Sequence, residues 1–372
     1  MILLDAPQQS RRSLLPHLHL DWPLFTGLLL LAAGGLAVLY SASGESNEMV
    51  LRQVTRLSVA FLLMFVFAQI TPDTLRRWTP LVFGSGLLLL LAVLVMGEIG
   101  KGAQRWLDLG VFRFQPSEMM KMAVPLMVAW YLAETPLPPP LRRILIGVVI
   151  FLVPALLIAK QPDLGTALLI LSAGAFVLLF AGLPWRLVSF TALLAVPATL
   201  ILWHYGMHDY QRRRVLTFLN PESDPLGSGY HIIQSTIAIG SGGLYGKGWL
   251  NGTQSHLEFL PERHTDFIFA VIGEEFGLLG ILLLLALYLF IILRCLYIAS
   301  RAQDTFTRLL GGGLTMTFLV YVFVNIGMVT GLLPVVGVPL PLVSYGGSSM
   351  VTLMASFGML MSIHTHRKLL KT

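Results

Sequence analysis

The sequence predicts an all-α polytopic membrane protein with about ten transmembrane helices and a large extracytoplasmic loop between helices 7 and 8. Of its 372 residues, 55% are hydrophobic and only 12% are charged, whereas about a quarter of the residues in soluble globular proteins are charged. The mean hydropathy is +0.76. Apolar runs close to the roughly 18 residues that span a bilayer recur along the chain. This composition excludes a soluble globule.

Ten apolar segments are the candidate membrane spans. They are 24–40, 57–70, 81–96, 122–132, 144–159, 164–181, 187–203, 267–293, 309–333 and 351–363. The fourth is short, and it spans a membrane only if the charged turn that contains Glu118 and Lys121 joins it. Residues 204–265 form too long a stretch for a plain connection. We therefore divide the chain into an N-terminal tail, 1–20, and one integral-membrane domain, 21–372, with 204–265 as its large outer loop.

Positive charges in the short loops predict the orientation. An even number of spans places both termini on one side, and arginine and lysine gather on that side. They are Arg11, Arg12, Arg76, Arg77, Arg142, Arg143, Arg186, Arg294, Arg301, Arg308, Arg367, Lys368 and Lys371. Because cytoplasmic loops collect these residues, we expect both termini in the cytoplasm. The net charge of +6 is explained by this topology and does not indicate nucleic acid binding.

The first apolar run and the single cysteine have simple interpretations. Arg11 and Arg12 precede a run that ends at 41–43, SAS, which resembles a secretory signal with its cleavage site. The run is too long for a signal and more spans follow, so we expect an uncleaved first helix. Cys295 is the only cysteine, which excludes an internal disulfide and a cysteine metal cluster. We expect it to be a small apolar filler.

Polar residues concentrate in four outer segments, whereas the inner loops are short. The outer segments are 97–118, which runs on to Lys121, then 160–163, 204–265 and 334–347. Within the third, 232–239 is apolar enough for a helix at the outer interface but too short to span. The glycine turns that follow end in Gly246-Lys247-Gly248, which lacks the Ser or Thr of a phosphate loop. We therefore predict no nucleotide site, and keep the turn amides as a candidate anion contact.

Carboxylates in and beside the eighth span are the strongest sign of function, because an acid in hydrocarbon is costly unless it is paired, hydrated or used. Asp266 lies where the outer loop enters this span. It could cap the helix, and it could act as a general base for a hydroxyl that arrives from outside; both roles can hold together. His264 is a rival base. Glu274 and Glu275 lie about 12 Å deeper and point about 100° apart, so at least one should bond a neighbouring helix.

Two further residues suggest the chemistry of the ligand. Glu118 and Lys121 are spaced i and i+3 and share one helix face, which is typical of an internal ion pair or of a cationic phosphate contact held by its acid neighbour. An outward-facing polar cavity with acids, Lys, Arg and Trp among apolar helices suits an amphiphile with an anionic head and a lipid tail. A lipid-linked sugar diphosphate fits, and it needs no ATP because the diphosphate is already activated.

Four long stretches resemble one known family. They are KGAQRWLDLGVFRFQPSEMMK at 101–121, KQPDLGTA at 160–167, HIIQSTIAIGSGGLYGKGWLNGTQSHLEFLPERHTDFIFAVIGEEFG at 231–277, and LPVVGVPLPLVSYGGSS at 333–349. In this order they resemble the SEDS family of peptidoglycan glycosyltransferases, from about residue 20 to the C-terminus. The resemblance implies a ten-helix fold that polymerises lipid II at the outer face of the bacterial inner membrane during cell elongation. Division members of the family share the motifs, so the elongation role rests on overall likeness.

The resemblance also implies roles for individual residues. Asp266 would be the catalytic base that deprotonates the acceptor 4-hydroxyl, which attacks the donor anomeric carbon with inversion and releases undecaprenyl diphosphate. Substrate-binding or positioning roles fall on Glu118, Lys121, Arg105, Trp106 and Glu258, to which we add Asp163 and Arg263 from the outer segments. We assign the basic residues to phosphate, and the acids to positioning or to a divalent cation, Mg²⁺ or Mn²⁺, whose ligands are unknown. No nucleotide cofactor is expected.

The expected partners follow from the same resemblance. The chain would work beside a class B penicillin-binding protein, which supplies the transpeptidase, and beside other membrane proteins of the elongation complex, with no nucleic acid partner. Two alternatives stay open: a lipid II flippase and a non-catalytic scaffold of the elongation machinery. A flippase needs access to both faces, against which the short inner loops argue. A scaffold would tolerate Asp266→Asn.

Overall fold

The computed structural model describes residues 18–100, 103–108, 113–207, 209–223, 228–256, 260 and 262–367. Glu258, one of the predicted site residues, lies outside these ranges, as does most of the predicted tail. The described chain is nearly all helical. Three short antiparallel strands interrupt the helices between α3 and α4, where no strand was predicted: β1 (Glu98–Gly100), β2 (Ala103–Asp108) and β3 (Arg113–Phe114).

In the part of the chain that the structure describes, six helices are long and apolar enough to cross a membrane. They are α1 (Trp22–Ala42), α2 (Asn47–Gln69), α3 (Pro72–Met96), α5 (Leu141–Lys160), α11 (Ile268–Ser300) and α12 (Thr305–Val329). Four shorter apolar helices accompany them: α4 (Pro116–Leu132), α6 (Leu164–Phe180), α7 (Trp185–Ile201) and α13 (Ser348–Thr365). Because α4 begins at Pro116, it includes the charged turn with Glu118 and Lys121, as expected. The chain is therefore a multi-pass membrane protein.

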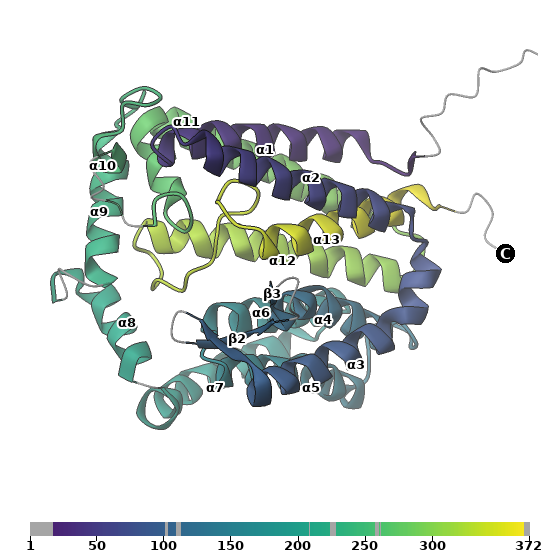
Figure 1. The fold of residues 1–372 in the computed structure, drawn as a ribbon. Helices are drawn as coiled ribbons and strands as arrows, with labels where there is room; N and C mark the ends of the chain where they lie inside the picture. Colours follow the sequence, from purple (N-terminus) through teal and green to yellow (C-terminus); the bar gives the residue numbers. More distant parts are fainter. Residues whose placement is uncertain are drawn as a thin grey trace, which may run out of the picture.

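The helices form two groups that α12 joins. Figure 1 shows α1, α2, α11 and α13 on one side of the bundle and α3 to α7 on the other. Helix α12 packs against α11 and also against α6 and α4. Gly313 permits the close approach to α6, because a Cβ at this position would lie 2.4 Å from Val177. Phe318 of α12 extends the core toward the first group, with ring centroids 5.8 Å from Tyr288 and 5.0 Å from Phe357.

Short helices cover the end of the bundle that lies away from the start of α1 and the end of α13 (Figure 1); we call this end outer and the opposite end inner. They are the π-helical turn η2 (Leu202–Gly206), α8 (Asp209–Leu219), the 3-10 turn η3 (Pro221–Ser223), α9 (Ser228–Ser241) and α10 (Thr253–His256). Helix α9 contains the apolar stretch 232–239 that was predicted as a surface helix, and glycine turns follow it as expected.

An ion-pair cluster ties three helices together at the inner end. Asp21 caps α1 by accepting from Leu24 N (3.0 Å) and binds Arg294 of α11 through two hydrogen bonds (3.0 and 2.6 Å). His364 Nε2 of α13 lies 3.4 Å from the same carboxylate. Burial alone would raise the pKa of Asp21, but the hydrogen bonds from Arg294 and Leu24 outweigh it and hold the pKa below its usual value. This cluster lies at the opposite end of the bundle from Asp266.

The segment 334–347 folds back into the outer end of the bundle without forming a helix. Its Ser344 Oγ donates to Thr265 O (2.5 Å), and Tyr345 N donates to His264 O (2.8 Å). Its other side packs on α1 at Gly35, where a Cβ would lie 2.9 Å from Val343 Cα. We call residues 334–347 the re-entrant segment; it bonds to the two residues that precede Asp266.

Candidate active site

Asp266 lies at the outer end of the bundle, half-buried, at the entry to α11. Phe267 occupies the N-cap position of α11, one residue after Asp266. Its carboxylate faces the re-entrant segment at Gly337, where a Cβ would lie 3.5 Å from Asp266 Oδ2. Gly337 has φ +73°, a conformation that favours glycine. The bare main chain at this position leaves room beside the carboxylate.

Three contacts fix the main chain around Asp266. Asn325 of α12 is fully buried, and its Nδ2 donates to Asp266 O (2.9 Å) and to Val338 O (2.7 Å). The two bonds from the re-entrant segment hold the preceding residues, Thr265 and His264. Because buried hydrogen bonds fix geometry as well as add stability, Asp266 is held by α12 and by the re-entrant segment together.

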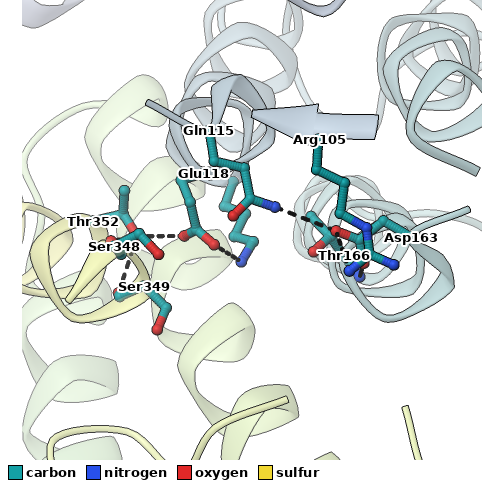
Figure 2. Close-up of polar contacts among 9 residues, drawn as sticks. Arg105, Gln115, Glu118, Asp163, Thr166, Ser348, Ser349 and Thr352 are labelled. Carbon is teal, nitrogen blue, oxygen red and sulfur yellow. Dashed lines mark hydrogen bonds and ion pairs between the residues drawn. The ribbon is translucent and has the colours of Figure 1, made fainter. Parts of the chain in front are cut away.

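Arg105 and Asp163 form a second polar group at the outer end. Arg105 of β2 donates from Nη2 to Pro162 O (2.6 Å), and its Nη1 lies 3.8 Å from Asp163 Oδ2. Asp163 caps α6 by accepting from Thr166 N (3.2 Å) and accepts from Gln115 Nε2 (3.3 Å), as Figure 2 shows. The Arg105 side chain is 34% exposed, whereas that of Asp163 is 9% exposed. Arg105 is therefore the member of this group that a ligand can reach.

A cavity of about 160 Å³ separates this group from the re-entrant segment. Arg105 and Asp163 line one side of the cavity, and Pro334 to Val336 line the other. Gly165 allows the segment to approach α6 closely, since a Cβ there would lie 3.0 Å from Val336 O. Val336 thus lines the cavity while the next residue, Gly337, faces Asp266.

Glu118 and Lys121 form the internal ion pair that their spacing predicts. Lys121 Nζ lies 2.7 Å from Glu118 Oε1, and the side chains are only 7% and 8% exposed. Thr352 of α13 donates to Glu118 Oε2 (3.1 Å), and the Lys121 ammonium lies 5.0 Å from the ring centroid of Tyr321 on α12. Figure 2 shows Glu118 and Thr352 on one side of Gln115 and the Arg105 group on the other. The pair therefore joins three helices behind the accessible surface.

Glu274 and Glu275, which lie deeper in α11, bond to different neighbours, as their spacing predicts. Glu275 accepts a hydrogen bond from Ser41 Oγ of α1, and Glu274 pairs with Lys247 of the outer loop. The Lys247 and Gly248 amides donate to main-chain oxygens of α11. The expectation that these turn amides contact an anion is therefore wrong for both.

Two other predicted site residues, Trp106 and Arg263, are half-buried. Trp106 follows Arg105 in β2, where it pairs with Glu98, and is half-buried. Arg263 is half-buried next to His264, whose ring centroid lies 6.0 Å from that of Tyr345. Among the residues that the structure describes, no three His, Cys, Asp or Glu side chains come together.

Sequence reasoning missed several residues that build the site: Asn325, Gly337, Gln115 and Thr352. A lone asparagine within an apolar span is itself a signal, because a polar side chain in hydrocarbon needs a partner. Glycine in a proline-rich stretch indicates a turn of unusual conformation. Gln115 and Thr352 gave no such signal, since Gln115 is the N-cap of α4 and Thr352 lies near the start of α13, where polar residues are ordinary.

Comparison with known proteins supports the motif-based resemblance. The sequence profile of the FtsW, RodA and SpoVE family, described as cell cycle proteins, matches residues 18–369. The peptidoglycan glycosyltransferase MrdB of Escherichia coli strain K12 is 56% identical over 361 residues, covering 97% of this chain and 98% of that protein. The peptidoglycan glycosyltransferase RodA of Treponema pallidum is 34% identical, with 93% of this chain and 98% of that protein covered.

Solved structures share the fold as well. A chain of a peptidoglycan synthase complex that coordinates polymerization and crosslinking is 34% identical with a TM-score of 0.80, covering 94% of this chain and 99% of that one. The rod shape determining protein RodA of Thermus thermophilus is 29% identical with a TM-score of 0.71, covering 94% and 98%. The chain therefore belongs to the FtsW, RodA and SpoVE family.

Proposed function

We propose that this chain is a peptidoglycan glycosyltransferase that joins lipid II units into glycan strands at the outer face of the bacterial inner membrane, during cell elongation. The family and its relatives named as peptidoglycan glycosyltransferases support the reaction class. One structural observation supports Asp266 as the catalytic residue. Its half-buried carboxylate lies at the outer end of the bundle, beside Gly337, on a main chain held by Asn325.

The chemistry needs one base and one cationic contact. Asp266 accepts the proton of the acceptor sugar hydroxyl, whose oxygen then forms a bond to the donor anomeric carbon. The bond from that carbon to the phosphate oxygen breaks at the same time, with inversion, and undecaprenyl diphosphate leaves with the electron pair. Arg105 is a partly exposed cation that lines the cavity and can bind diphosphate oxygens through its planar guanidinium.

The other predicted site residues take supporting roles. Lys121 is buried against Glu118, so we assign this pair to holding α4, α12 and α13 in register, and no longer to direct phosphate contact. Asp163 orients Arg105 while it caps α6. Trp106, Glu258 and Arg263 remain candidates for contacts to the sugars at the rim.

The topology is part of the proposal. We place ten spans in the membrane, the six long helices with α4, α6, α7 and α13, and a large outer loop, 204–265, between the seventh span, α7, and the eighth, α11. The basic residues near the inner helix ends support cytoplasmic termini. We keep residues 1–20 as a tail and 21–372 as one membrane domain.

A divalent cation and partner proteins complete the proposal. Mg²⁺ is usually bound by one or two carboxylates together with substrate phosphates, so the lipid diphosphate would supply most of its ligands here, and no step above depends on it. The similarity to a chain of a peptidoglycan synthase complex supports a class B penicillin-binding protein as the crosslinking partner, with other membrane proteins of the elongation machinery.

Purified protein in nanodiscs tests the reaction. We expect it to convert lipid II into glycan strands without ATP, with the products resolved on a gel, and we expect Asp266→Asn to abolish them. Fluorescent lipid II in sealed vesicles, scored for protection from an external quencher, tests the flippase alternative. Movement of lipid without polymer would contradict the proposal, and so would strands that do not depend on Asp266.

A further inference from the structure

Helix α11 is broken at Gly277, well inside the apolar run. Gly277 has φ +63° and ψ −158°, so the regular i to i−4 bonds across it cannot form. A short stretch of the outer loop, residues 243–248, replaces them with four main-chain hydrogen bonds. The four are Leu278 N to Gly243 O (2.9 Å), Leu279 N to Leu244 O (3.2 Å), Lys247 N to Glu274 O (3.0 Å) and Gly248 N to Glu275 O (2.9 Å).

This pairing satisfies the main-chain groups that the break releases. An unpaired amide or carbonyl in the hydrocarbon region costs several kcal/mol, so the break and the loop depend on each other. Glycines make the contact possible: a Cβ at Gly246 would lie 2.1 Å from Glu275 O, and a Cβ at Gly277 would lie 2.4 Å from Gly246 N. A Cβ at a third glycine, Gly242, would lie 2.0 Å from Gly273 O.

Side chains lock the same stretch. Glu274 is fully buried and accepts from Lys247 Nζ (2.7 Å), Gln254 N (2.9 Å) and Thr253 Oγ1 (3.1 Å). Lys247 also donates to Thr253 Oγ1 (2.7 Å). A buried carboxylate is tolerated only when it is paired in this way. We call residues 243–248 together with the Glu274 to Lys247 pair the loop clamp.

The loop clamp holds one end of the helix segment that begins next to Asp266. Residues 268–275 are all buried, and this helical stretch connects the loop clamp to Asp266. Asn325 and the re-entrant segment hold its start, and the loop clamp holds its end. Asp266 precedes Gly277 by eleven residues, or about 17 Å at 1.5 Å per residue. A tilt of about 5° at the break would move the carboxylate by about 1.5 Å, and a shift of about 1 Å can cost a hundredfold in rate.

We propose that Lys247 and Glu274 are positioning residues for glycosyl transfer, because the loop clamp sets the tilt of the outer part of α11 and with it the position of Asp266. This inference rests on the proposed function. Neither residue needs to touch substrate in this role. The effect should therefore fall on kcat rather than on KM for lipid II.

Kinetics of matched variants test the proposal. We expect Lys247→Met to lower kcat about 10- to 100-fold with KM for lipid II unchanged, and Lys247→Arg to stay within about threefold of the wild type. The double variant Lys247→Met with Glu274→Gln avoids an unpaired buried charge, and it should fold and show the same loss of kcat. The control is Arg52→Met, which breaks an exposed ion pair with Glu48 on α2. Wild-type kcat in the double variant, or a loss confined to KM, would overturn the proposal.

Hydrogen exchange separates this inference from the proposed function. In the double variant we expect amides of 268–276 to exchange roughly tenfold faster, with α12 unchanged, whether or not the protein polymerises lipid II. Unchanged exchange would overturn the loop clamp while leaving an Asp266-dependent polymerase intact. The reference for these exchange rates is the wild-type protein in the same nanodiscs.

Discussion

Replacing Asn325 with leucine tests how Asp266 is held. The two residues have similar volume, so the change removes the amide donor and leaves little cavity. Two buried carbonyl oxygens, Asp266 O and Val338 O, would each lose a donor that now lies at 2.9 and 2.7 Å. A buried acceptor without a partner costs about 1–3 kcal/mol. The substitution also removes the buried Asn325 Oδ1, which has no hydrogen-bond partner among the described residues, so we expect Asn325→Leu to lower the free energy of unfolding by about 1–3 kcal/mol in total.

The same substitution should reduce catalysis in the molecules that remain folded. Without the bond from α12 the entry to α11 can shift, so we expect kcat to fall about tenfold or more. SDS-induced unfolding in mixed micelles, followed by tryptophan fluorescence, gives the stability, and the lipid II assay gives kcat. Thr330→Val is the control, because the Thr330 hydroxyl bonds only within α12 and should change neither quantity much. If Asn325→Leu matched the wild type in stability and kcat, α12 would not hold Asp266.

Three further outcomes are expected. Asp21→Asn leaves the partly exposed Arg294 without its anion and should lower the unfolding free energy by about 1–2 kcal/mol. We expect kcat to be unchanged, because Asp266 lies at the other end of the bundle. A lowered kcat would argue against this separation. Lys121→Met leaves the buried Glu118 carboxylate without its cation and should lower the unfolding free energy by about 3–5 kcal/mol. Adding Glu118→Gln should recover most of this loss. If it recovered none, the broken ion pair would not be the cause. Burial lowers the pKa of His231 below its usual 6.5, so the unfolded state binds this proton at higher pH than the folded state. Unfolding midpoints should therefore be constant above about pH 6.5 and fall as the pH drops below it, and His231→Gln should flatten this decline; an equal decline in both proteins would assign it elsewhere.

Hydropathy predicted the membrane character but placed several helix ends wrongly. The eighth span was expected at 267–293, whereas α11 runs to Ser300, because a helix continues past the hydrocarbon into charged residues that a hydropathy window rejects. The strands near Arg105 were not predicted, since their pairing joins short stretches with no alternating pattern.

The candidate site could be predicted only where one residue carried its own signal. Asp266 was found because an acid at the mouth of an apolar helix is unusual, and Glu118 and Lys121 because their spacing is local. The break at Gly277 was hidden, since glycine is tolerated inside a membrane helix. The pair of Glu274 with Lys247 joins residues 27 positions apart, and only the folded loop reveals it.

The proton acceptor role of Asp266 is tested most directly by binding and turnover measured on one preparation of the same variant. Asp266→Asn keeps the shape of the side chain and one acceptor oxygen but cannot take up a proton at neutral pH. We predict that this variant binds lipid II as tightly as the wild type while kcat falls about 10²- to 10⁴-fold, the range that general base catalysis supplies. An asparagine variant that binds lipid II normally and turns it over within about threefold of the wild-type rate would contradict this prediction.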